Sequence, residues 1–140
     1  MRKVHIVTYT HWDREFRWEF ERTRMRLVDL FDHLFEIMEE KQDYRSFLCD
    51  GQFTLLEDYL EIRPEMKDTV KKYVEDGRLE IGPWFSLPDC APIQGESVVR
   101  NLQYGIKRSR EFGEPLKCGY NVFSFGQIGQ LPQIYQNFDI

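Results

Sequence analysis

The stretch SFLCDGQFTLLEDYLE, residues 46–61, decides the fold class of this chain. Its first residues are mostly apolar and end in Asp50-Gly51, a pair that is common in turns. The residues after the turn carry apolar side chains at helical spacing, namely Leu55, Leu56, Tyr59 and Leu60. The stretch therefore predicts a short strand, a turn and an amphipathic helix in succession. Parallel α/β folds are built from this unit.

The same order extends in both directions along the chain. Strands are predicted over 1–10, 46–50, 78–82 and 116–122, and the helices over 19–41, 52–61, 96–112 and 131–137, with a further helix beginning at Pro64. This alternation predicts βα units with parallel strands, in a single domain spanning 1–140. Complete parallel barrels need roughly 200 residues or more. We therefore expect these residues to be the first half of a larger α/β fold.

Composition narrows the classes of partner and compartment. The chain has 140 residues, 41% of them hydrophobic, and a formal net charge of −5. A mildly acidic chain without a basic stripe argues against nucleic acid as the main partner. Its three cysteines are widely spaced and form no C-x-x-C pair, which favours a reducing compartment. No signal-peptide-like or membrane-spanning run is present, so we expect no membrane association and a cytoplasmic location.

Candidate functional residues follow from the fold prediction. In parallel α/β architectures, functional side chains gather at the C-terminal ends of the strands. That rule selects four segments, which are 11–16, 50–52, 82–89 and 121–127. We expect these segments to lie side by side.

The pair His11 and Asp13 is the most informative of these candidates. An imidazole nitrogen and a carboxylate oxygen, two residues apart on a loop, can point at one ion, and zinc accepts both kinds of donor. The alternative is a histidine that hydrogen-bonds the aspartate in a loop without metal. Spacing alone leaves both interpretations open.

Two other candidates also have a structural alternative. Asp50 is either a turn residue or, because of its place at a strand end, a contact for a sugar. Trp84 either fills the core or stacks on a sugar ring.

Several motifs, in order, resemble glycoside hydrolase family 38 α-mannosidases. THWDREF (10–16) resembles the H-W-D-R-E-W opening of the bacterial members. DGQ (50–52) follows the second predicted strand. GESVVRNLQYG (95–105) and GYNVFSFGQIGQLPQI (119–134) resemble two later blocks of that family. The resemblance spans essentially the whole chain.

The resemblance implies a fold, an activity and site residues. The fold would be the first half of an N-terminal seven-stranded α/β barrel that carries zinc. The activity would be retaining hydrolysis of α-mannosides or oligosaccharides by a carboxylate nucleophile and a second carboxylic acid. Carried over by position, His11 and Asp13 match two zinc ligands, Phe16 takes the place of a tryptophan that packs on the sugar, and Phe125 lies near the nucleophile.

The sequence departs from the family pattern where the chemistry is concentrated. Phe123 occupies the position of the aspartate that is both nucleophile and zinc ligand, and Val122 replaces the proline before it. Tyr9 replaces a histidine often found two residues before the ligand His11. The regions that supply the acid/base carboxylate and the remaining zinc histidine are not among these residues. We therefore expect this chain alone to be inactive, with no catalytic residue of its own.

Three function classes remain in competition. The first is a piece of an α-mannosidase barrel, and the second is a non-catalytic carbohydrate-binding or interaction module derived from that barrel, which Phe123 favours. The third is a metal-dependent deacetylase or hydrolase of similar shape, which the motifs at 95–105 and 119–134 oppose. A half-barrel exposes strand edges, so we also expect self-association or pairing with the rest of the barrel.

Overall fold

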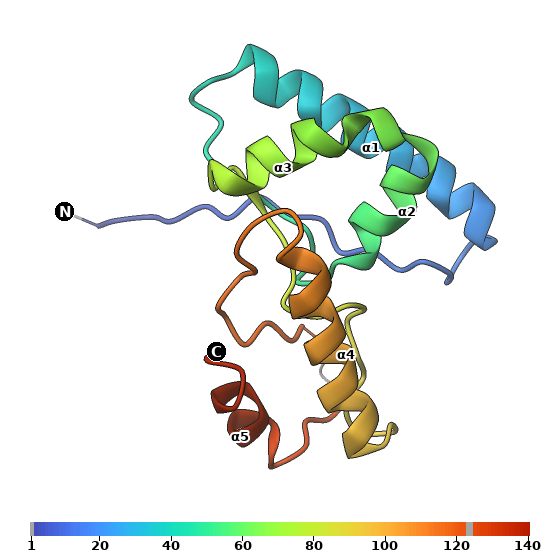
Figure 1. Cartoon of the computed structure of the whole chain (residues 1–140), viewed down its shortest axis with the longest axis vertical. Helices are drawn as coiled ribbons and strands as arrows, with labels where there is room; N and C mark the ends of the chain where they lie inside the picture. Colours follow the sequence, from blue (N-terminus) through green and yellow to red (C-terminus); the bar gives the residue numbers. More distant parts are fainter. Residues whose placement is uncertain (1, 123–124) are drawn as a thin grey trace.

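The computed structural model describes residues 2–122 and 125–140 (Figure 1). The predicted nucleophile position, Phe123, lies outside the described residues.

Parallel strand pairing lies at the centre of the fold. Strands β1 (Phe47–Leu48) and β2 (Leu79–Glu80) form a two-stranded parallel sheet in which Phe47 pairs with Leu79. Tyr9 makes a parallel bridge to Leu48 on the other edge of β1. Beyond β2, the Leu116 N–H donates to the Ile81 carbonyl at 2.9 Å. Mixed helix and parallel strand content agrees with the predicted α/β class.

Two of the four predicted strands are absent as regular elements. Of the segment predicted over 1–10, the described residues 2–10 pair only at their end, where the Thr8 carbonyl accepts from the Leu48 N–H at 2.9 Å. Its earlier residues extend away from the body of the molecule, and Val4 and Ile6 are 82% and 84% exposed (Figure 1). The segment predicted over 116–122 forms no strand either. Apolar residues alone do not make a strand, because a strand also needs a partner along its length.

The first helix confirms the prediction made from its periodicity. α1 (Phe20–Glu40) lies within one residue of the predicted bounds at each end. Its buried residues fall on one face, which is the face that the spacing selected: Thr23, Leu27, Val28, Phe31, Leu34, Phe35 and Met38.

Three shorter helical elements follow β1. They are α2 (Thr54–Ile62), the 3-10 helix η1 (Pro64–Met66) and α3 (Lys67–Glu75). Gly77 follows the end of α3, its φ of +68° favours glycine, and the Arg78 N–H donates back to the Tyr73 carbonyl at 2.8 Å. This reversal directs the chain into β2.

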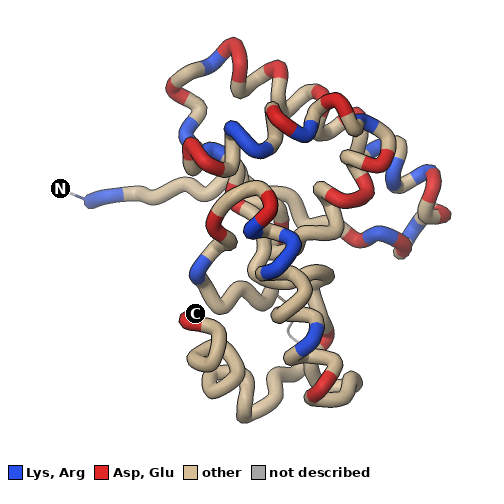
Figure 2. The backbone as a smooth tube through the Cα atoms, in the orientation of Figure 1, with Lys and Arg blue, Asp and Glu red and all other residues tan. Residues whose placement is uncertain are grey.

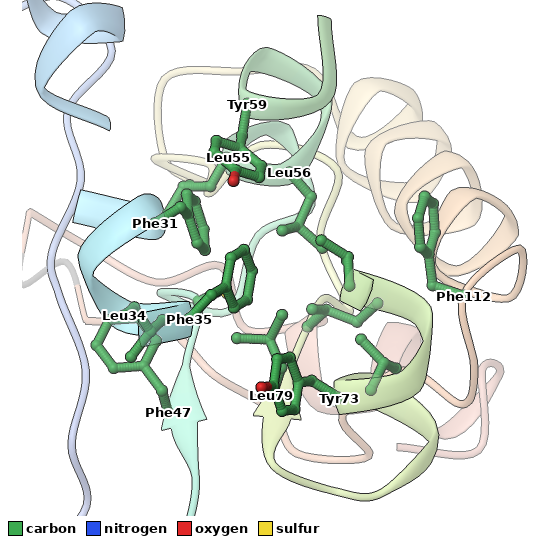
Figure 3. Close-up of a cluster of buried hydrophobic side chains, with 14 of the residues drawn as sticks. Phe31, Leu34, Phe35, Phe47, Leu55, Leu56, Tyr59, Tyr73, Leu79 and Phe112 are labelled. Atoms are coloured by element: carbon green, nitrogen blue, oxygen red, sulfur yellow. The ribbon is translucent and has the colours of Figure 1, made fainter. Parts of the chain in front are cut away.

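Two hydrophobic clusters hold these elements together. Figure 3 shows the first, in which side chains from α1, α2, α3 and both strands converge, including Phe31, Phe35, Tyr59, Tyr73 and Leu79. The Phe35 and Tyr73 rings stack with centroids 5.6 Å apart. The second cluster includes side chains of α4 (Gly95–Ser109) and α5 (Leu131–Gln136). Its buried members are Trp84, Cys90, Val98, Leu102, Ile106 and Leu131.

Asp32 links α1 to the end of α2 and gives the first prediction. Its carboxylate accepts from the Tyr59 hydroxyl at 2.8 Å and from the Arg63 guanidinium at 2.9 Å. The hydrogen bond from Arg63, opposed by desolvation and helped by Tyr59, lowers the pKa of Asp32 below its ordinary value of 3.8. A lowered pKa stabilises the fold above that ordinary value, and the contribution is lost as the pH falls through the folded-state pKa.

We expect Asp32→Asn to lower the free energy of unfolding at pH 7, because the charged hydrogen bonds to Arg63 and Tyr59 are weakened. The loss should be only about 1 kcal/mol, because Asp32 and Arg63 are both partly exposed. Urea unfolding at pH 7 and at pH 2.5 measures this. The difference from the unchanged chain should shrink at the lower pH, because the charge of Asp32 is lost as the pH falls towards its lowered folded-state pKa. A difference of equal size at both pH values would contradict the assignment.

Candidate metal and substrate site

The loop that carries His11 and Asp13 is fastened at the residue between them. The Trp12 N–H donates to Asp50 Oδ2 at 2.9 Å, and the Trp12 carbonyl accepts from Gln52 Nε2 at 3.1 Å. The Trp12 ring packs against the first hydrophobic cluster. Both neighbouring side chains are thereby held at the C-terminal end of the parallel segments, as the fold rule predicts.

The two ring nitrogens of His11 face different carboxylates. Nδ1 lies 3.0 Å from Asp50 Oδ2 and 3.3 Å from Oδ1. Nε2 lies 3.4 Å from Asp13 Oδ1. Asp50 is fully buried, whereas the side chains of His11 and Asp13 are 39% and 44% exposed. When Nδ1 carries the proton and donates to Asp50, Nε2 presents its lone pair on the side of Asp13.

Asp50 contacts His11 from the protein interior and does not face solvent. Its oxygens also accept from Gln52 Nε2 at 2.9 Å and from the Tyr120 hydroxyl at 3.0 Å. The residue is 0% exposed and adopts a φ of +49°, in the turn that the Asp-Gly pair indicated. The predicted direct sugar contact by Asp50 does not fit this position, because its acceptor capacity is used inside the protein.

Tyr120 and Gln52 are part of this arrangement and were not singled out from the sequence. Burial raises the pKa of Tyr120, and the nearby negative charge of Asp50 raises it further, so the hydroxyl stays a donor. A Cβ at Gly51 would lie 2.2 Å from the Tyr120 ring, so glycine is what allows this approach. Both residues lie inside motifs that match the family, DGQ and GYNVFSFGQ. The motifs could have marked them, but no residue pattern assigned them a contact.

An open pocket of about 430 Å³ lies beside His11 and Asp13. Phe16, predicted to pack on a sugar, lines it and is 77% exposed. The other lining residues come from the same loop and from the first turns of α1, and they are Trp12, Arg17, Trp18, Thr23, Arg26 and Asp29. The structure therefore brings Phe16 together with the two candidate metal ligands.

The two other predicted substrate residues lie elsewhere. Trp84 is fully buried, and its Nε1–H donates to the Tyr120 carbonyl at 2.8 Å. Of the two alternatives for Trp84, the structure places it in the core, where no sugar could stack on its ring. Phe125 is 75% exposed but does not line the pocket beside His11.

The donor set is compatible with part of a zinc site. A histidine nitrogen held by a buried carboxylate, with a second carboxylate on its outer side, is the arrangement that orients zinc-binding histidines. Within residues 2–122 and 125–140, no group of three or more His, Cys, Asp or Glu side chains is placed to hold a metal. His11 and Asp13 thus fit two of the ligands that a zinc ion needs.

The distribution of charged residues and the hydropathy of the helices concern two other classes of partner, nucleic acid and membrane. Acidic and basic residues both occur along α1 and α3, whereas the charged residues of α2 are all acidic (Figure 2). Among the described residues, no helix combines the length and the apolar character needed to cross a membrane.

Comparison with known proteins identifies relatives for the whole chain. The family model described as Glycosyl hydrolases family 38 N-terminal domain matches residues 1–140. A protein of Halalkalibacterium halodurans named "Putative mannosylglycerate hydrolase" is 47% identical over 132 residues, which are 94% of this chain and 15% of that protein.

Solved structures agree with these sequence matches. An alpha-mannosidase from Enterococcus faecalis V583 superposes with a TM-score of 0.92 at 42% identity, over 95% of this chain and 15% of that one. A protein in the glycosyl hydrolase family 38 from Enterococcus faecalis gives 0.81 at 38% identity, over 93% and 15%. This chain therefore spans 15% of the length of these relatives. The chain belongs to the glycosyl hydrolases of family 38, in whose N-terminal domain it lies.

Proposed function

We propose that this chain contributes half of the zinc site of a retaining α-mannosidase-type hydrolase. One observation carries the proposal, which is that buried Asp50 holds His11 Nδ1 while Nε2 faces Asp13. His11 Nε2 and Asp13 Oδ1 would then be zinc ligands. We also propose that the parallel segments around β1 and β2 begin the seven-stranded α/β barrel that the resemblance implies.

The residues of the site have separate roles in this proposal. A zinc ion at His11 and Asp13 would bind sugar hydroxyls and polarise them as a Lewis acid. Phe16 offers an exposed aromatic face on which a mannose ring can stack. Asp50 orients His11 without touching substrate. By resemblance, Phe125 would lie near the reacting carbon, in a part of the site outside the pocket described above.

The substrate class follows from the family and its named members. One Enterococcus faecalis structure is named as an alpha-mannosidase. The Halalkalibacterium halodurans protein is named as a putative mannosylglycerate hydrolase. Neutral α-mannosides and mannosylglycerate are therefore the candidate substrates of the whole protein. We do not expect turnover by this chain alone, because two donors rarely hold a catalytic zinc and the acid/base carboxylate is not among these residues.

A non-catalytic carbohydrate-binding or interaction module is the alternative, and Phe123 is the observation that favours it. A phenylalanine can neither attack an anomeric carbon nor bind zinc. The unpaired edge at Val4 and Ile6 also provides a surface for self-association or for the rest of a barrel.

Placing a carboxylate at position 123 distinguishes the hydrolase from the non-catalytic module. We expect Phe123→Asp, in a full-length protein that contains this chain, to turn over an aryl α-mannoside at least about 100-fold faster than the unchanged protein, because a nucleophile is supplied. A matched Phe125→Asp variant tests whether any added carboxylate suffices, and it should give no gain. Release of the aryl alcohol, followed by absorbance, measures the rate. No gain in the folded Phe123→Asp protein would favour the non-catalytic module.

A further inference from the structure

Arg14, the residue directly after Asp13, is held by a bidentate ion pair with Asp58 of α2. Its Nε donates to Asp58 Oδ2 at 2.8 Å, and its Nη2 donates to Asp58 Oδ1, also at 2.8 Å. Two parallel hydrogen bonds fix the orientation of a guanidinium group as well as its position. The centroid of the Phe20 ring, at the start of α1, lies 4.8 Å from the guanidinium carbon. Arg14 thus joins the loop to both helices.

The described residues contain two buried carboxylates, Asp50 and Asp58. Burying a carboxylate costs free energy unless a partner compensates its charge. Both find such partners on the loop that carries Asp13. Asp50 accepts from the Trp12 N–H, and Asp58 accepts from the side chain of Arg14. The two buried carboxylates therefore fasten the residues directly before and directly after Asp13.

The side chain of Asp13 has few contacts of its own. It is 44% exposed, and within the described part of the chain its one basic neighbour within 4.0 Å is His11 Nε2, at 3.4 Å. A metal ligand has to be held within about 0.5 Å of its productive position. Because so little contacts its side chain, the position of Asp13 depends on how firmly the backbone on either side of it is fixed.

The alternative is that Arg14 and Asp58 form an ordinary link between a loop and a helix. Arg24 and Glu61 form such a link nearby, at 2.7 Å, between α1 and α2. The Arg24 guanidinium carbon also lies close to the Phe20 ring, 5.2 Å from its centroid. The two pairs differ in burial, because the side chain of Glu61 is 67% exposed and that of Asp58 only 7%. They also differ in place, because Arg24 lies on α1 and is not next to a candidate ligand.

We propose that Arg14 and Asp58 are positioning residues for Asp13. Their bidentate pair fixes the chain directly after Asp13, and the hydrogen bonds of the Trp12 backbone fix it directly before. The Asp13 carboxylate is then held on the side of His11 Nε2 before a metal ion binds. The inference rests on the proposed zinc site, and it gives Arg14 and Asp58 no contact with metal or substrate.

Calorimetric titration of the metal-free full-length protein with zinc tests this inference. Arg14→Lys keeps a positive charge beside Asp58 but cannot make two parallel hydrogen bonds. We expect it to raise the zinc dissociation constant about 10-fold, the lower end of the range found when residues that support metal ligands are changed. Asp58→Asn should give a similar loss, because its amide replaces one of the two acceptor oxygens with a donor.

Arg24→Lys is the matched control, because it makes the same substitution in the other ion pair beside Phe20. Its zinc affinity should stay within about twofold of the unchanged protein, since this pair is exposed and remote from Asp13. Cooperative urea unfolding shows whether each variant is folded. An unchanged zinc affinity in folded Arg14→Lys, or an equal loss in Arg24→Lys, would overturn the inference.

A double-mutant cycle shows whether Arg14 acts through Asp13. Asp13→Asn keeps a carbonyl oxygen and leaves His11 in place, so a weaker zinc site remains to be titrated. In this background, Arg14→Lys should change the zinc affinity by less than about twofold, because the ligand that it positions is already impaired. A loss that persists at its original size in Asp13→Asn would show a general loosening of the loop and would also overturn the inference.

The outcomes separate this inference from the function on which it rests. If the unchanged full-length protein binds zinc through His11 and Asp13 but Arg14→Lys has no effect, the inference fails and the proposed function stands. If the folded, unchanged protein binds no zinc, both fail.

Discussion

Asp50→Asn is expected to weaken zinc binding by the full-length protein about 10- to 100-fold, the range found when a carboxylate behind a metal-binding histidine is changed. The amide nitrogen cannot replace Oδ2, because Trp12 N–H and Gln52 Nε2 both donate there. It will therefore take the place of Oδ1, beside the Tyr120 hydroxyl and 3.3 Å from His11 Nδ1. His11 Nδ1 then keeps an uncharged oxygen at the Oδ2 position, 3.0 Å away, as its acceptor, and the amide nitrogen replaces the second carboxylate oxygen beside it.

Two readouts distinguish positioning from loss of fold. Calorimetry gives the zinc affinity, and ¹⁵N NMR of the His11 ring reports which nitrogen carries the proton. We expect the proton to leave Nδ1 for part of the population. Asp32→Asn is the matched control, because it makes the same change at a carboxylate remote from His11 and should leave zinc affinity unchanged. Equal zinc affinity in Asp50→Asn and the unchanged protein would rule out this role for Asp50.

Gly105→Ala is expected to destabilise the chain by about 3 kcal/mol or more, at the upper end of the cost of overpacking. A Cβ at Gly105 would lie 2.2 Å from the Phe85 N and from the Trp84 carbonyl carbon, and 2.3 Å from the Pro83 carbonyl oxygen. These are backbone atoms, so no rotamer change relieves the overlap. α4 would have to move away from the loop that holds buried Trp84.

The same helix provides the control for this prediction. Gly95 begins α4, and a Cβ there would meet no atom within 4 Å. Gly95→Ala should change the free energy of unfolding by less than about 1 kcal/mol. Urea unfolding at pH 7 measures both variants. If Gly105→Ala unfolds within 1 kcal/mol of the unchanged chain, α4 does not pack on residues 83–85 as closely as described.

The helices could be predicted from the sequence, but the outer strands could not. α1 and α5 were predicted to within about a residue because their apolar residues repeat at helical spacing. The segments 1–10 and 116–122 contain equally apolar runs, yet they pair at single positions. Strand formation depends on a neighbouring chain segment, and a local pattern does not contain that information.

The site shows the same division between local and distant information. His11 and Asp13 were found from a two-residue spacing on one loop, and the structure places them together. The role of Asp50 depends on Tyr120, which lies 70 residues further along the chain. Trp84 stood at a strand end like the other candidates, but its burial depends on α4 and α5. Contacts between distant segments therefore decide which of the candidate residues can face a substrate and which, like Asp50 and Trp84, are buried behind them.

Zinc titration of the full-length protein by calorimetry tests the central claim most directly. We expect a single zinc to bind with a sub-micromolar dissociation constant, to be lost in His11→Ala, and to bind this chain alone more weakly than micromolar, because the chain supplies two donors. A folded His11→Ala variant that binds zinc as tightly as the unchanged protein would contradict the claim that His11 and Asp13 form half of a zinc site.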